Sequence, residues 1–276
     1  MKQCGSVYLI VIWSLFLMSS CSTKSSDMSK DTKEVRIVFL HHSTGKVIWQ
    51  GGNSLTTKVK GKLGMQSAVE KWFKRYNKQH AVNYLISETV FPKKEPYGWR
   101  NYPYDYYNIW VKNGHLDYYQ DEPTLRTLTK KFDVIILKHC FPVSKIENGE
   151  GADINSDKKT LNNYKLQYEA LYQEFQKYPD TQFILWTPAA LTQKRAENEW
   201  AKNTALFHQW IINEWDKTDD NVFIWDFYAL ETEGGMYLKD EYAMGDFDAH
   251  PNSRLAKKAF PLFCQCIVDV IENKSE

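Results

Sequence analysis

The chain has 276 residues, and its 35 basic and 34 acidic side chains give a net charge of only +1. No basic stripe of the kind that binds nucleic acid is present, so we expect no nucleic-acid partner. The five cysteines include no Cys-x-x-Cys pair of the kind that holds zinc, and we predict no metal or other cofactor.

Residues 1–20 have the pattern of a secretory signal peptide. Lys2 supplies a weakly positive start, and residues 7–18 are a nearly unbroken apolar run, too short to span a bilayer comfortably. The small residues Ser19 and Ser20 then precede Cys21. This ending resembles a bacterial lipobox, whose cysteine is lipidated after cleavage. The alternative is an ordinary signal peptide cut nearby, with Cys21 incidental.

The segment that follows, residues 21–33, is polar and rich in Ser and Lys, which favours a flexible tether. With Cys21 lipidated, the protein would be anchored in the bacterial cell envelope, at the outer membrane or facing the periplasm, and would meet the membrane only through that anchor. The remaining residues, 34–276, number about 240, which suits a single α/β domain.

Apolar runs and helical patterns alternate along this domain. Residues 35–40 and 81–90 read as strands, and Ser67 with Glu70 forms a capping box before a helical face. Residues 92–113 are aromatic and irregular, and long ordered loops often carry function. Further strands are predicted at 132–138, 181–187 and 221–226, and helices at 124–131, from 157, at 196–215 and from 252, where Pro261 should kink or restart the last one.

This alternation predicts an α/β fold, a three-layer α/β/α sandwich around a mostly parallel sheet. In such sheets the functional site lies at the carboxyl ends of the strands. Ser43 follows the first strand, residues 138–140 follow a later one, and the turn that carries His250 comes just before the final helix. We therefore expect these residues on one rim.

Ser43 and His250 are the candidate nucleophile and base. A serine hydroxyl needs a base within hydrogen-bond reach, and a neutral imidazole can shuttle its proton. Pro251 disfavours helical backbone at His250, which projects the imidazole ahead of the final helix. Asp248 and Asp246 compete as the acid that orients His250. The alternative for Ser43 is a turn serine that caps a helix.

These two segments resemble the first and last blocks of the SGNH hydrolases, also called GDSL-type esterases. The first block here is Val38-Phe-Leu-His-His-Ser-Thr-Gly45, and the last is Asp246-Phe-Asp-Ala-His-Pro-Asn252. The resemblance implies a flavodoxin-like sheet and ester hydrolysis through Ser43 and His250. The family's acid stands three residues before its histidine, where this chain has Phe247, so either aspartate remains possible.

A second departure concerns the oxyanion hole. The family's third block, Gly-x-Asn-Asp, is replaced here by Lys138-His-Cys-Phe-Pro142, which lacks the asparagine donor. The Ser43 backbone N–H remains, and Lys138, His139 or Asn101 are candidates for a second donor.

The aromatic segment offers candidate substrate contacts. Trp99 could stack on a sugar ring and Arg100 could hold a carboxylate, unless the segment packs on itself. Two other chemistries are weaker alternatives: a thiolate at Cys140, and a metal site. The metal ligands would be His41, His42, His139, Asp248 and His250, at spacings that fit no known motif.

The sequence thus predicts an SGNH-type ester hydrolase at the cell envelope that removes O-acyl groups, with acetyl the first choice, from a carbohydrate or another small ester. The alternative is a glycan-binding lipoprotein of the same fold that does not catalyse.

Overall fold

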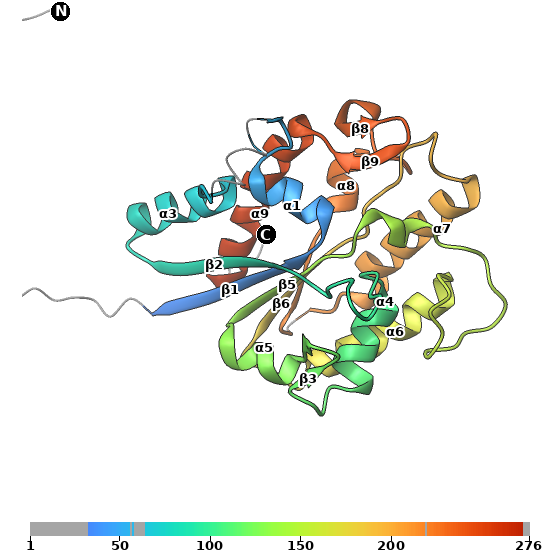
Figure 1. Ribbon diagram of the computed structural model, residues 1–276, viewed down its shortest axis with the longest axis horizontal. Coiled ribbons are helices and arrows are strands. Elements are labelled where there is room, and N and C mark those ends of the chain that lie inside the picture. Colours follow the sequence, from blue (N-terminus) through green and yellow to red (C-terminus); the bar gives the residue numbers. More distant parts are fainter. Residues whose placement is uncertain (1–32, 56, 58–63, 219, 273–276) are drawn as a thin grey trace, which may run out of the picture. The chain divides into compact units, whose positions relative to one another are not determined.

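Five parallel strands form the central sheet in the computed structural model, which describes residues 33–55, 57, 64–218 and 220–272 (Figure 1). The strand order is β2-β1-β5-β6-β7, and each neighbouring pair is parallel. The chain runs from β1 outward to β2 and returns to the other side of β1 as β5. This reversal opens a crevice at the carboxyl ends of β1 and β5. The strand bounds are β1 Glu34–His41, β2 Asn83–Val90, β5 Val134–Leu137, β6 Gln182–Trp186 and β7 Val222–Trp225.

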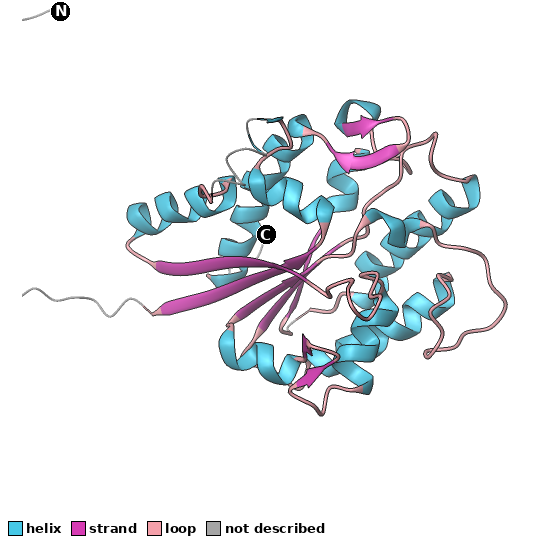
Figure 2. Ribbon diagram, viewed as in Figure 1, coloured by secondary structure: helices cyan, strands magenta, loops and turns pink. Residues whose placement is uncertain are grey.

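Helices cover both faces of the sheet, which confirms the predicted three-layer α/β/α class (Figure 2). Side chains of β1 alternate between two cores: Phe39 enters one and Leu40 the other, and neither is exposed. Covered parallel strands are apolar on both sides, which explains the continuous apolar runs. On the Phe39 side lie α1 Ser43–Gln50, α3 Ala68–His80, α8 Phe227–Thr232 and α9 Ser253–Ile271; on the other lie α4 Pro103–Tyr106, the π-helix η1 Tyr107–Lys112, α5 Leu125–Lys131, α6 Leu161–Phe175, α7 Asn198–Trp210 and the π-helix η3 Ile211–Trp215.

The expected capping box is present: Ser67 Oγ accepts from the Glu70 N–H, and a Glu70 carboxylate oxygen accepts from the Ser67 N–H. The helix α9 does not restart at Pro261, because burial of Phe263 and Ile267 on its inner face holds it together. The remaining elements are the pairs β3 Tyr118–Tyr119 with β4 Glu122–Pro123 and β8 Ala243–Gly245 with β9 Asp248–Pro251, and the 3₁₀ turns η2 Phe141–Ser144 and η4 Asp240–Tyr242.

The aromatic segment corrects one expectation. Residues 92–102 are irregular, but residues 103–112 are helical, because Pro103 starts α4 and the Asp105 carboxylate accepts from the backbone N–H groups of Arg100 and Tyr102 at 2.8 and 3.0 Å. The π-helix η1 then continues the turn and buries its aromatic face in the second core.

Residues 32–276 form one compact unit. The predicted signal peptide, the tether and Cys21 lie outside the described residues. Along the described part of the chain, no helix is both long and apolar enough to cross a membrane.

Candidate active site

Ser43 begins α1 directly after β1, at the crevice beside β5. His42 is extended, with φ −119° and ψ −154°, and its side chain does not cap the helix. The first N–H groups of a helix have no acceptor within it. The exposed Ser43 side chain therefore lies at the N-terminus of α1, where the backbone N–H groups have no acceptor within the helix.

His250 lies on β9, in the hairpin that leads into α9. Asn252 fixes the end of this hairpin, because its side-chain oxygen accepts from the N–H groups of Arg254 and Leu255 at 2.9 and 3.2 Å. Its amide nitrogen donates to the Glu241 and Ala243 carbonyls at 2.8 and 3.1 Å. One asparagine thus caps α9 and holds the strand that carries His250.

The nucleophile helix and the histidine hairpin are tied together by Asn53, shortly after α1. Its amide nitrogen donates to the Pro251 carbonyl at 3.0 Å, and its oxygen accepts from Ser253 Oγ at 2.9 Å. The αL conformation of Gly51, with φ 72°, ends α1 and turns the chain toward these partners. Nothing in the sequence pattern singled out Asn53.

Ser43, His250 and Asp248 form a continuous chain of hydrogen bonds. Asp248 Oδ1 accepts from the Nδ1–H of His250 at 2.6 Å, and this proton leaves Nε2 as an acceptor for Ser43 Oγ at 2.8 Å. Asp248 Oδ1 also accepts from the His250 backbone N–H at 3.1 Å. A base within reach of a hydroxyl, and oriented by a carboxylate, is the geometry that serine nucleophiles require.

Asp248, rather than Asp246, contacts His250. The Asp246 carboxylate is paired with Lys194 at 2.5 Å instead. Asp226 binds His208 at 2.8 Å and caps α8, a structural role. Although burial acts to raise the pKa of Asp248, the hydrogen bonds from His250 and the charge of Arg195 hold it below its ordinary value, so the carboxylate is ionised.

Phe141 and Arg195 complete the wall behind His250. The Phe141 ring meets the His250 ring edge-on, with centroids 4.7 Å apart, and the Arg195 guanidinium lies 4.7 Å from the Phe141 centroid. Arg195 also donates to the Phe247 carbonyl at 2.6 Å, which fixes the tip of the hairpin. Their contacts with the hairpin depend on the tertiary structure, and no local pattern predicted them.

Asn101 and Cys140 lie near Ser43, where a second oxyanion donor was expected. Cys140 Sγ lies 3.7 Å from Ser43 Oγ, and the Cys140 N–H donates to Asn101 Oδ1 at 2.7 Å. The Asn101 amide nitrogen lies 2.9 Å from the Phe91 carbonyl and 3.2 Å from the Lys138 carbonyl. Asn101 is completely buried and its donors are taken, so it positions Cys140 and is not a free oxyanion donor.

Lys138 and His139 likewise do not reach the Ser43 crevice, which corrects their candidacy as the second oxyanion donor. Lys138 is fully buried, its ammonium lies 5.7 Å from the centroid of Trp186, and burial lowers its pKa. His139 Nδ1 donates to the Asn101 carbonyl at 3.1 Å, and burial lowers the pKa of its imidazole to about 3. Both side chains turn into the core because β5 is central and covered on each face.

The two candidate substrate contacts in the aromatic segment, Trp99 and Arg100, differ in their exposure to solvent. Trp99 is only 7 % exposed and packs in the second core, so no face is free to stack on a sugar. Arg100 is exposed, and its side chain remains available to solvent.

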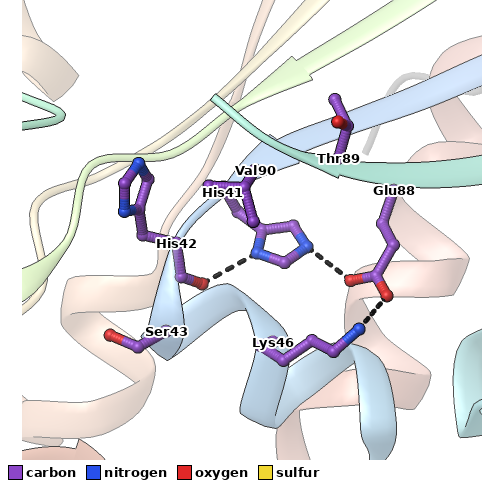
Figure 3. Close-up of a pocket in the computed structure, with 7 residues that line it drawn as sticks. All are labelled: His41, His42, Ser43, Lys46, Glu88, Thr89 and Val90. Atoms are coloured by element: carbon purple, nitrogen blue, oxygen red, sulfur yellow. Dashed lines mark hydrogen bonds and ion pairs between the residues drawn. The ribbon is translucent and has the colours of Figure 1, made fainter. Parts of the chain in front are cut away.

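A cavity of about 420 Å³ opens beside Ser43, between the start of α1 and the end of β2 (Figure 3). Figure 3 shows the His41 ring between the His42 carbonyl and Glu88, with Lys46 on the other side of Glu88. Burial lowers the pKa of His42, and its ring donates to the Pro92 carbonyl at 2.7 Å. Glu88 and Lys46 were not recognised in the sequence, because each lies in an ordinary strand or helix pattern. The cavity is lined by His41, His42, Ser43, Lys46, Glu88, Thr89 and Val90.

No group of three or more metal-ligating side chains occurs among the residues that the structure describes. The candidate ligand histidines bind protein groups instead: His41 binds Glu88, His42 binds Pro92, and His250 binds Asp248 and Ser43. Cys140, Cys264 and Cys266 do not form disulfide bonds.

Neither a protein-family model nor a curated protein matches this chain. Among solved structures, one described as a platelet activating factor from Streptococcus pneumonia is 13 % identical, with a TM-score of 0.44 and 86 % of each chain covered. A lipase/acylhydrolase from Enterococcus faecalis is 13 % identical, with a TM-score of 0.44, 88 % of this chain covered and 97 % of that one. A carbohydrate esterase, described as having divergent catalytic and non-catalytic binding functions, is 12 % identical, with a TM-score of 0.36 and coverage of 86 % and 66 %. At these scores the likenesses carry no function to this chain, and the geometry around Ser43 has to support one by itself.

Proposed function

We propose that this protein is a serine-dependent ester hydrolase of the SGNH type. The observation that carries the proposal is the hydrogen-bonded chain from Ser43 Oγ through His250 to Asp248, with distances of 2.8 and 2.6 Å. It stands at the carboxyl edge of a parallel sheet, where ligands bind in such folds.

In the proposed reaction, His250 Nε2 takes the Ser43 hydroxyl proton as Oγ bonds to the ester carbonyl carbon. The carbonyl oxygen becomes an oxyanion, which the Ser43 backbone N–H stabilises. When the intermediate collapses, the carbon–oxygen bond to the alcohol breaks and His250 returns the proton to the departing alkoxide. A water molecule then attacks the acyl-enzyme with His250 again as base, which releases the acid and restores Ser43. The ionised Asp248 keeps the Nδ1 proton in place throughout.

The substrate class we propose is an O-acylated carbohydrate of the cell envelope, with acetyl as the acyl group. Two features support it. The signal-like start and Cys21 favour an anchored envelope protein. The cavity beside Ser43 presents the Lys46 ammonium and the Glu88 carboxylate, a donor and an acceptor suited to sugar hydroxyls.

The decisive experiment compares Ser43→Ala with the matched control Ser87→Ala, whose hydroxyl donates to the Ile37 carbonyl in the sheet. Hydrolysis of 4-nitrophenyl acetate and acetate release from acetylated glycans should fall at least about 10³-fold in Ser43→Ala and stay unchanged in the control. A fluorophosphonate probe should also label the peptide that contains Ser43.

Equal activity in wild type and Ser43→Ala would refute the proposal. If the protein binds acetylated glycans without hydrolysing them, and Ser43→Ala leaves this binding unchanged, the protein is a glycan-binding protein and not a hydrolase. The burial of Trp99 weighs against that alternative, because it removes the stacking surface on which it depended.

A further inference from the structure

His41 is a buried polar residue immediately behind the candidate nucleophile. It ends β1, two positions before Ser43, and is 1 % exposed. Its ring packs on Phe39 with centroids 4.4 Å apart. A Cβ on Gly45 would come within 2.5 Å of the His41 Cβ and 2.6 Å of its ring, so α1 approaches this histidine as closely as glycine allows.

Both ring nitrogens of His41 face acceptors. Nδ1 lies 2.7 Å from the His42 carbonyl oxygen, and Nε2 lies 2.7 Å from Glu88 Oε2 (Figure 3). A carbonyl oxygen only accepts, so Nδ1 must carry a proton. If Glu88 is ionised, its oxygens only accept as well, and Nε2 must then also carry a proton.

The surroundings of Glu88 favour the ionised form. Its other oxygen accepts from the Lys46 ammonium. Burial acts to raise the pKa of Glu88, but the hydrogen bonds from His41 and Lys46 outweigh it and hold the pKa below its ordinary value. With a carboxylate on one side and a carbonyl on the other, both ring nitrogens of His41 are placed to donate hydrogen bonds.

We propose that His41, held as a cation by Glu88, polarises the peptide group between His42 and Ser43 and thereby strengthens the Ser43 N–H as the oxyanion donor. The inference rests on the proposed ester hydrolysis at Ser43. His41 is a positioning residue in this scheme, since it acts through the backbone and does not touch the substrate.

The physical basis is that the carbonyl and the N–H belong to one conjugated peptide unit. The His42 carbonyl oxygen accepts from His41 Nδ1–H at 2.7 Å and from the Lys46 N–H at 3.0 Å, the first hydrogen bond of α1. A charged donor on a carbonyl draws electron density from the amide nitrogen, and hydrogen bonds in such chains reinforce one another. The effect matters here because the Asn101 donors and the Cys140 N–H are already committed.

The first test is spectroscopic and needs no variant and no activity. Nitrogen-15 NMR of the histidine rings in the wild-type protein at neutral pH should show His41 with both nitrogens protonated and His250 with one. A singly protonated His41 would overturn the proposal, whatever the enzyme hydrolyses.

The second test is kinetic and uses Glu88→Gln, which keeps the shape but removes the charge that holds the imidazolium. We expect one His41 nitrogen to lose its proton, and kcat for 4-nitrophenyl acetate to fall on the order of tenfold with KM unchanged. This is less than the roughly 10²–10³-fold loss when an oxyanion donor is removed outright. A purely structural role would lower the melting temperature without this split between kcat and KM.

The matched control is Glu233→Gln. Glu233 also joins a lysine to a second donor, with Lys258 Nζ at 2.8 Å and the Tyr242 hydroxyl at 2.6 Å, and it does not line the cavity. Its kcat should stay at the wild-type value. If Ser43→Ala abolishes hydrolysis but Glu88→Gln keeps full kcat, the His41 inference fails while the proposed function stands; if Ser43→Ala is fully active, the proposed function itself fails.

Discussion

The side chains of His250 and Asp248 beside Ser43 remain partly open to solvent, whereas the rings of Trp99, Tyr106 and Trp110 are closed off from it. The side chains of His250 and Asp248 are 30 % and 50 % exposed, and hydrogen bonds fix their positions. Trp99 is 7 % exposed and Trp110 is not exposed at all, and apolar packing fixes them. A reactive group must meet its substrate, so it is held by directional bonds at an edge, while a large aromatic ring contributes most where water is excluded.

This contrast means that variants in the two regions should fail in different ways. Changes at the rim should remove activity from a protein that stays folded. Changes in the aromatic segment should lower the free energy of unfolding and leave the activity of each folded molecule nearly intact.

The largest effect is expected for His250→Asn. Asparagine cannot take the Ser43 proton, so kcat/KM for 4-nitrophenyl acetate should fall at least about 10³-fold. Urea unfolding should show a change below about 1 kcal/mol, since the side chain lies at the rim. A comparable loss of stability and activity together would break the contrast between the regions.

The next effect is expected for Asp248→Asn, with Asp246→Asn as its neighbour control. An amide at position 248 would no longer hold the Nδ1 proton of His250, so kcat should fall roughly 10²-fold or more. Asp246 is paired with Lys194 and away from the His250 ring, so its variant should lose less than about threefold. The opposite ranking in steady-state kinetics would assign the orienting acid to Asp246.

Trp99→Ala should lower stability and leave activity nearly unchanged, the opposite of the rim variants. Loss of a buried indole should cost about 3 kcal/mol of unfolding free energy, measured by denaturant titration. The kcat of the folded fraction should stay within about threefold of wild type. A selective loss of glycan affinity with unchanged stability would instead mean that the segment contacts substrate.

Glu231→Gln tests a buried carboxyl group in the core. Burial raises the pKa of Glu231 from 4.5 to about 8, despite a hydrogen bond from the Ala190 N–H and the charge of Lys138. The folded state thus binds a proton that the unfolded state has released in this interval, so wild-type stability should decline as pH rises from about 4.5 to about 8. Glu231→Gln should decline by several kcal/mol less, on the order of 5, over the same range in pH-dependent thermal unfolding, because the amide does not titrate. Parallel curves for the two proteins would refute this assignment.

Local patterns were sufficient for the layer architecture. The apolar runs around Ile37, Ile135 and Ile184 lie in parallel strands because both of their faces are covered, and the capping box at Ser67 starts a helix as its hydrogen bonds require. The sequence left the role of the aromatic segment open, because the same residues suit a binding surface or a core. Only the packing of α4 and η1 against α6 decides between them.

The sequence by itself determined the alternation of strands and helices and the presence of Ser43 and His250 at the ends of such elements, because these follow from periodicity and from residues near in the chain. The tertiary structure decided that Asp248 and not Asp246 orients His250, that Asn101 supports Cys140, and that Glu88 holds His41. Asp246 and Asp248 flank Phe247, and no sequence pattern distinguishes one from the other as the partner of His250. Glu88 is 47 residues from His41, so no local pattern pairs them. Hydrogen bonds select partners by distance and angle, and those are fixed only when the hairpin, α1 and β2 meet at one edge of the sheet.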